Sequence, residues 1–197
     1  MSRLRALSLG GNGYSSCMSP SPAPADRRPP AWPWYVGAAA AVTATAVAGG
    51  RFVDPAAPWY RALRKPSWQP PSWTFGAVWT PLYGSLAWAG GRALATTRGG
   101  ERTRLLGSLG TNLVLNAGWN ALFFGRRSPR AGLAGTVLLD LSNAELVLRV
   151  ARADRPAGRA LLPYATWCLF ATALNGALVR LNPGSGHPGP RAGHAGR

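Results

Sequence analysis

Residues 65–89 read KPSWQPPSWTFGAVWTPLYGSLAWA, with four Trp, four Pro and no charged side chain after Lys65. The prolines near its start cannot lie inside a regular helix without breaking it, because each removes a backbone donor and clashes with the preceding turn. The second half is uncharged and long enough to form a helix. The stretch therefore predicts a stiff, ring-rich connection that leads directly into an apolar helix.

Four other runs in the chain also lack basic residues. Charged residues make up 14% of the 197 residues, whereas a typical soluble domain has about 25%. A membrane helix needs about 20 mostly apolar residues, and a core helix of a soluble protein usually carries charges on its outer face. The five long and mostly apolar runs without Lys or Arg are 29–50, 66–91, 105–125, 131–148 and 160–179. They predict an all-α fold, an integral membrane bundle of five transmembrane helices.

The predicted helices lie near 34–53, 74–95, 104–124, 131–151 and 159–181. Together they form one membrane domain over residues 34–183. Residues 1–33 and 184–197 are rich in Gly, Pro and Arg, and we expect a disordered N-terminal extension and a disordered C-terminal tail. The first run also ends in Ala-Val-Ala, as signal peptides do, but a retained helix is the favoured interpretation.

The basic residues do not indicate a nucleic-acid partner. The chain has 22 Lys and Arg against 6 Asp and Glu, but nucleic-acid binding requires them on one face or in one tract. Here they are spread between the apolar runs, so the lipid bilayer is the expected partner. The two Cys and two His form no metal-ligand pattern. The chain has no glycine-rich phosphate loop and no nucleophile–base pair, and we expect no required cofactor and no metal site.

Polar residues recur on one face of the third predicted helix. Asn112, Asn116 and Asn120 are spaced at i, i+4 and i+8, which places them on one side. Amides are costly in hydrocarbon unless they are paired, so this face should point into the bundle. Two interpretations remain open at this point: contacts that join helices, and a pocket wall that offers donors and acceptors.

The fourth predicted helix carries Thr136, Asp140 and Asn143 on one face. A carboxylate inside a membrane indicates a functional site by default, but Asp140 could equally be protonated or bonded to the Asn face opposite. Glu145 precedes Arg149 by four residues, a spacing typical of an ion pair on a helix surface.

The fifth predicted helix presents Tyr164, Cys168, Ala171 and Asn175 on one face, with Trp167 beside it. Combined with the aromatic face of the second helix and the amide face of the third, this predicts an apolar, aromatic cavity. Such a cavity suits a planar hydrophobic ligand, a tetrapyrrole or a sterol. The predicted lining residues are Trp79, Tyr83, Asn116, Trp119, Trp167 and Ala171.

Three blocks of the chain resemble the TspO/MBR family, the translocator or tryptophan-rich sensory proteins. They are WYRALRKPSWQPPSWTFGAVWTPLYGSLAWA, LNAGWNALFFGRRSP and LLPYATWCLFATALNGALVRLNP. The resemblance extends over residues 34–183 and implies five transmembrane helices in a bundle that is often a homodimer. It also implies binding of porphyrins and, in some members, of cholesterol and benzodiazepine-type ligands.

The resemblance also implies roles for single residues. The connection after the first helix would be a lid, with Trp59, Trp68, Pro70, Pro71 and Trp73 in it. Trp119, Asn116 and Ala171 match pocket residues of the family. Trp79 and Trp167 match two Trp that are linked to light-dependent porphyrin breakdown.

The residues 174–180 read LNGALVR and lack the Tyr of the family's cholesterol-recognition pattern, a weak pattern in any case. We therefore expect a tetrapyrrole, of the porphyrin or haem type, in preference to a sterol. The expected function is that of a sensor, carrier or scavenger. The alternatives are a light-dependent porphyrin-degrading enzyme with Trp79 and Trp167 as catalytic rings, and a transporter of sterols or other small molecules. Arg is used almost to the exclusion of Lys, and Ala and Gly are abundant, a composition typical of a GC-rich genome. This favours a bacterial plasma membrane, with a mitochondrial membrane or endomembrane as the alternative location.

Overall fold

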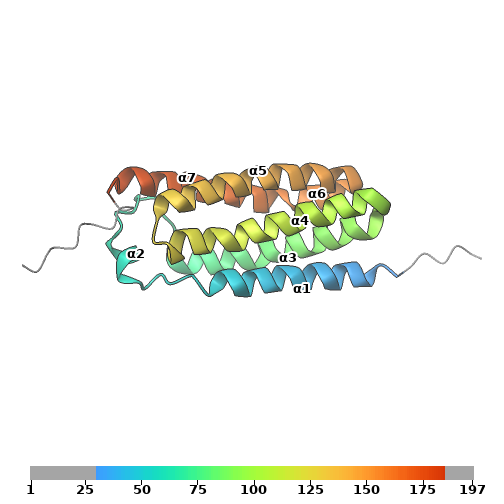
Figure 1. Cartoon of the computed structure of the whole chain (residues 1–197), viewed down its shortest axis with the longest axis horizontal. Coiled ribbons are helices and arrows are strands. Elements are labelled where there is room, and N and C mark those ends of the chain that lie inside the picture. The colour runs from blue at the N-terminus through green and yellow to red at the C-terminus, as the bar shows by residue number, and fades with distance from the viewer. Residues whose placement is uncertain (1–29, 185–197) are drawn as a thin grey trace, which may run out of the picture.

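A computed structural model of the chain describes residues 30–184. The predicted disordered extension and tail fall almost entirely on residues 1–29 and 185–197, outside the described part. Within residues 30–184 the chain is all-helical and contains no strand. The helices run side by side in one elongated bundle, and the short α2 crosses one end of it (Figure 1).

Five long helical units form the bundle, each close to one of the five predicted helices. The third unit continues from an α-helix into a π-helical segment, and the fifth is a short helix followed by a long one. The elements are α1 (Trp32–Gly50), α2 (Pro58–Ala62), α3 (Ser72–Thr96), α4 (Gly99–Asn120), η1 (Ala121–Gly125), α5 (Pro129–Ala153), α6 (Arg155–Ala160) and α7 (Leu162–Leu181).

Proline and capping residues determine where several helices begin. The side chains of Ser128 and Asp154 accept hydrogen bonds from backbone amides in the first turns of α5 and α6, at 3.2 and 2.9 Å. Each helix has a proline in its first two positions, where the missing N–H costs nothing. Gly99 begins α4 with a φ of 55°, a left-handed conformation that glycine adopts without steric cost.

The sequence did not predict two local features. The helix α2 lies inside the connection that was expected to be irregular. The segment η1 has the wider π-helical backbone, a form that is common at functional sites. The predicted helix 74–95 already included Pro81, which lies within α3 although a proline in a helix interior removes one hydrogen bond.

Glycines allow the helices to approach each other closely. A Cβ atom on Gly91 of α3 would lie 2.8 Å from the Cα of Tyr35 in α1, and one on Gly158 of α6 would lie 2.6 Å from the Cα of Ala151 in α5. The first helix packs mainly on α3 and α4, and α5 packs on α4 and α7. The bundle core is therefore built from close backbone contacts as well as from leucine side chains.

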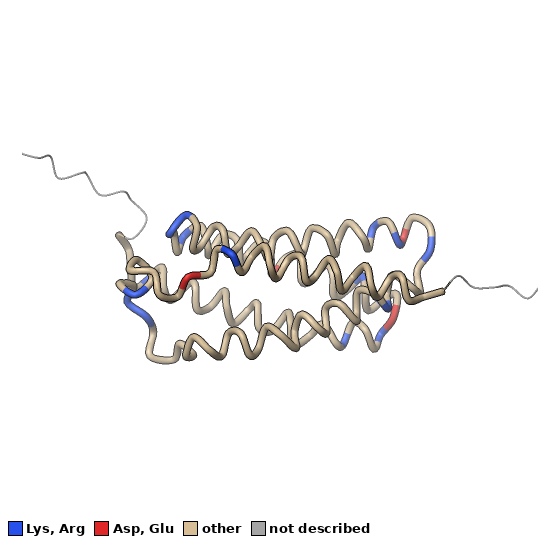
Figure 2. Tube along the Cα trace, turned by 90° about the horizontal axis from the view of Figure 1, so that it is seen from below, with Lys and Arg blue, Asp and Glu red and all other residues tan. Residues whose placement is uncertain are grey.

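The outer surface of the bundle is apolar along its length. Large apolar side chains face outward from the long helices, including Val114, Leu141 and Leu169, which are 71%, 66% and 58% exposed. Lys and Arg gather toward the two ends (Figure 2). Two helical units of the described part, Pro129–Ala153 and Arg155–Leu181, are long and apolar enough to cross a membrane by length and composition.

Candidate ligand-binding site

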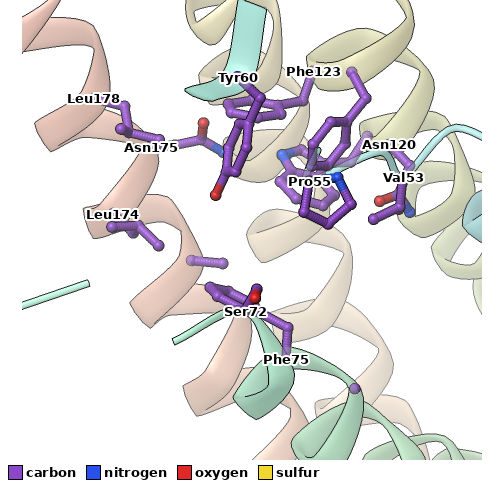
Figure 3. Close-up of a pocket in the computed structure, with 14 residues that line it drawn as sticks. Val53, Pro55, Tyr60, Ser72, Phe75, Asn120, Phe123, Leu174, Asn175 and Leu178 are labelled. Carbon is purple, nitrogen blue, oxygen red and sulfur yellow. The ribbon is translucent and has the colours of Figure 1, made fainter. Parts of the chain in front are cut away.

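An apolar cavity of about 200 Å³ lies at the end of the bundle that carries α2 (Figure 3). Its walls come from η1 and the ends of α3, α4 and α7, and residues of the connection 51–71 close it. Aromatic rings supply much of the lining, from Tyr60, Phe75, Trp119, Phe123 and Phe124. The π-helical segment contributes two of these rings.

The rings are packed against one another. Trp119 stacks on Phe123 with a centroid distance of 5.6 Å, and Phe123 contacts Phe124 edge to face at 4.9 Å. Tyr60, from the connection, reaches Phe124 at 5.4 Å. Such ring pairs stabilise packing beyond the area that they bury. The cavity therefore has rigid aromatic walls suited to a flat apolar ligand.

Two polar atoms of the lining residues are buried without a hydrogen-bond partner among residues 30–184. They are the indole N–H of Trp119 and Oδ1 of Asn175. Buried polar groups are almost always paired, and an unpaired one costs about 1–3 kcal/mol. Neither atom is accessible from the cavity in this conformation, so a ligand would pair with them only by displacing the side chains around them.

The connection 51–71 closes the cavity by ring contacts and hydrogen bonds. Tyr60 accepts a hydrogen bond from the Gln69 amide at 3.2 Å, and the Lys65 ammonium lies 4.2 Å from the centre of its ring. Burial raises the pKa of the Tyr60 phenol, an effect that the hydrogen bond from Gln69 only partly offsets. Tyr60 therefore stays neutral at physiological pH.

Asn182 ties the same connection to the end of α7. Its Oδ1 accepts from the backbone N–H of Arg64 and its amide donates to the Arg64 carbonyl, both at 2.9 Å. Asn182→Ala is expected to loosen residues 51–71, because both bonds are lost and neither has a local substitute. Faster amide hydrogen exchange in 51–71, with unchanged exchange in α5, is the expected result. Unchanged exchange in the connection would show that the ring contacts hold it alone.

The residues that the family resemblance assigned to a lid lie in different environments. Trp59 packs edge to face on Phe123 at 5.6 Å, and Trp68 packs on Phe170 at 5.8 Å. Pro70 and Pro71 directly precede α3. Trp73, in contrast, is 72% exposed, so it does not cover the cavity in this conformation.

Of the six residues predicted to line the cavity, Trp119 and Ala171 do so. Trp79 packs on Tyr83 with tilted rings at a centroid distance of 5.0 Å and contacts Tyr164 edge to face at 6.1 Å, deeper in the bundle. Trp167 contacts Phe75 at 6.0 Å, so one ring separates it from the cavity. A role of Trp79 and Trp167 in light-dependent porphyrin breakdown stays a prediction.

The other two predicted lining residues belong to a buried polar network. Tyr83 donates to Asn116 at 2.8 Å, and Asn116 donates to Tyr164 at 3.1 Å. Tyr164 donates to Asn112 at 2.9 Å, and Asn112 donates to Asn143 at 2.7 Å. The network joins α3, α4, α5 and α7. Of the two interpretations of the amide face, contacts between helices hold for Asn112 and Asn116, whereas Asn120 lines the cavity.

The predicted polar face of α5 is divided between two partners. Asn143 joins the network, while Asp140 accepts a hydrogen bond from Thr172 of α7 at 2.6 Å. Glu145 forms the predicted ion pair with Arg149 and also accepts from Ser108 at 2.5 Å. No cluster of potential metal ligands occurs among residues 30–184.

The sequence reasoning missed Tyr60, Phe75, Phe123 and Phe124 as lining residues. Phe123 and Phe124 follow Trp119 by four and five residues, a spacing that places only Phe123 on the same face of an α-helix. The π-helix shifts this phase, and both rings then line the cavity. Spacing in the sequence carries no signal for that shift.

Comparison with known proteins agrees with this architecture. The TspO/MBR family profile matches residues 37–181. A tryptophan-rich protein TspO from Chlorobaculum tepidum is 40% identical over 144 residues, 71% of this chain and 90% of that protein. The human translocator protein is 33% identical over 159 residues, 79% of this chain and 94% of that protein. A tryptophan-rich sensory protein from Cereibacter sphaeroides is 33% identical over 124 residues, 63% of this chain and 77% of that protein. The chain belongs to the TspO/MBR family of membrane proteins.

Proposed function

We propose that this protein binds a tetrapyrrole, of the porphyrin or haem type, in the cavity below the connection 51–71, as a sensor, carrier or scavenger. The observation that carries the proposal is an aromatic cavity whose lining residues Trp119 and Asn175 each hold a buried polar atom without a partner. Rings on the walls suit a flat macrocycle, and the two polar atoms would pair with its polar substituents or ring nitrogens once the side chains around them move.

The size of the cavity implies that the connection must move for this ligand. Pockets for drug-sized molecules have volumes of about 300–1,000 Å³, whereas this cavity has about 200 Å³. The helical walls are held by close packing, but the connection is held by Tyr60, Gln69 and the Asn182 bonds. An outward movement of residues 51–71 would enlarge the site without disturbing the bundle.

We also propose that all five helical units cross the membrane, most simply that of a bacterium. Their lengths support this, because α1 with 19 residues is the shortest and about 20 residues are needed. The outward apolar side chains support it as well, since a continuous exposed apolar surface indicates an apolar environment. The low hydropathy of α4 has a local cause, because its first turns contain Glu101, Arg102 and Arg104. The expected homodimer stays a prediction.

Binding is the better supported of the two chemical hypotheses. Light-driven degradation would require Trp79 and Trp167 to contact the macrocycle, and neither lines the cavity. Illumination of the porphyrin-loaded protein distinguishes them: a loss of the porphyrin absorption bands that disappears in Trp79→Phe and Trp167→Phe would favour the enzyme.

Ala171→Phe is expected to weaken protoporphyrin binding by about 10- to 100-fold, because a ring placed in a packed site costs about 1–3 kcal/mol. The measurement is a titration of the purified protein in detergent with protoporphyrin, followed by the absorption spectrum of the porphyrin. Ala173→Phe is the matched control, because Ala173 lies exposed on the same helix. Equal affinity of the two variants would place the ligand elsewhere.

A further inference from the structure

A second, basic pocket lies at the opposite end of the bundle from the aromatic cavity. It has a volume of about 410 Å³ and is formed where α1 and α4 begin and α3 ends. Its polar lining includes Arg92, Arg98 and Arg102, beside the rings of Trp34 and Tyr35. No Asp or Glu of residues 30–184 lines it. The pocket is therefore a site of concentrated positive charge at one end of an apolar bundle.

Only one of the three arginines is neutralised by a carboxylate. Arg92 forms an ion pair with Asp154 at 2.8 Å. Arg102 donates to the Thr97 carbonyl and lies over the Trp34 ring at 4.4 Å, yet its Nε is buried without a partner. Arg98 is exposed. The pocket thus offers two cationic groups, Arg98 and Arg102, that form no ion pair with a carboxylate of the described residues.

The acidic residue nearest along the chain does not change this balance. Glu101 borders a different pocket, which it shares with Arg104, Arg149 and Arg152. Glu145 is bonded to Ser108 and Arg149. An anion in the basic pocket would therefore meet Arg98 and Arg102 without competition from a protein carboxylate among the described residues. Arginine also binds phosphate in a planar, two-pronged geometry.

An apolar groove begins at the same place and runs along the outside of the bundle between α1 and α4. Trp34 lines both the groove and the basic pocket. The groove has a volume of about 400 Å³ and is otherwise lined by Pro, Gly, Ala and Leu side chains. Cβ atoms on Gly37 and Gly110, which line it, would meet nothing within 4 Å. The groove is therefore open at these two glycines, where no side chain fills the space between α1 and α4.

We propose that this end of the protein binds an anionic phospholipid, with its phosphate at Arg98 and Arg102 and one acyl chain in the groove between α1 and α4. The basic pocket alone would suit a free phosphate, and the groove alone would suit any apolar surface. Their junction at Trp34 suits a molecule with an anionic head and an apolar tail. Basic residues beside a membrane surface attract anionic lipids, because their positive charge lies close to the negative headgroups.

The test is native mass spectrometry of the full chain, delipidated in detergent and titrated with dioleoylphosphatidylglycerol or dioleoylphosphatidylcholine. The expected result is one preferentially retained phosphatidylglycerol per chain. Arg98→Gln, which changes an exposed side chain, should weaken its binding by about fivefold, in line with the contribution of one basic residue near a membrane. The pair Arg98→Gln and Arg102→Gln should weaken it further, whereas the pair Arg104→Gln and Arg152→Gln, equal in charge, should not.

A second pair of variants tests the groove. Gly110→Leu should weaken binding of phosphatidylglycerol because it fills the groove, whereas Gly107→Leu, also on α4 and in open space, should not. Equal retention of the two lipids by the unaltered chain would overturn the proposal. Displacement of the lipid by inorganic phosphate, with no effect of Gly110→Leu, would indicate a phosphate site and also overturn it. So would conversion of a dimer to a monomer by Gly110→Leu with unchanged lipid binding, because a second copy would then occupy the groove.

Discussion

Gly158→Ala is expected to destabilise the bundle by about 1–3 kcal/mol, the usual cost of inserting atoms into a packed core. The added Cβ would lie 2.5 Å from Cβ and 2.6 Å from Cα of Ala151, and 2.9 Å from its backbone nitrogen. Two of these atoms are backbone, so the clash can be relieved only by moving α6 away from α5. That movement would also disturb α7, which continues from α6.

The same substitution at Gly107 is the control and should have the opposite sign. Gly107 lies within α4 and its Cβ would meet nothing within 4 Å, so alanine there gains about 1 kcal/mol of helix propensity without a clash. Unfolding in a mixed detergent with increasing dodecyl sulfate, followed by circular dichroism, measures both variants. Stabilisation by Gly158→Ala would mean that α5 and α6 are farther apart than described here.

Asn112→Leu is expected to cost about 2–5 kcal/mol in the free energy of unfolding, because it removes three hydrogen bonds at once. Asn112 is fully buried, donates to Asn143 and Ser142, and accepts from Tyr164. Hydrogen bonds between membrane helices contribute about 0.6–1.7 kcal/mol each. Leucine is similar in size but leaves the three partners without Asn112, and α4 loses its polar contacts with α5 and α7 at this level.

A double-mutant cycle with Asn143→Leu separates pairing from packing. Because the two amides bond to each other at 2.7 Å, the double variant should be less destabilised than the sum of the single variants. Thr111→Leu, on the exposed side of the same turn, should change stability by less than about 0.5 kcal/mol. Additive losses in the cycle would show that Asn112 and Asn143 act independently.

The helices could be predicted because their signals are local. Long runs without Lys or Arg, bounded by arginines and prolines, indicate length and apolarity directly, and each predicted helix has a counterpart with ends shifted by a few residues. The short α2 was missed because five residues with two rings carry no periodic pattern. Its position depends on contacts of Tyr60 with Phe124 and Lys65 that form only after folding.

The candidate site could be predicted only in part. Trp119 and Ala171 lie at the cavity wall, on helices and faces that follow from helical spacing. Asn116 was placed on the correct inward face, but its two bonds to Tyr83 and Tyr164 turn it into a contact between helices. A helical pattern specifies which side of a helix is polar and cannot specify which neighbour takes its donors.

The sequence by itself determined that this chain is a bundle of five long helical units with a proline-rich connection before the second, because composition, proline position and helical period act within one segment. It also determined the family, because the blocks around Trp79, Trp119 and Trp167 are long and rich in rare residues. Only the tertiary structure decided which rings surround the cavity and which arginines meet beside Trp34. These depend on the π-helical shift at η1 and on the close approach of α1 to α3 and α4, distances between segments that no local pattern encodes.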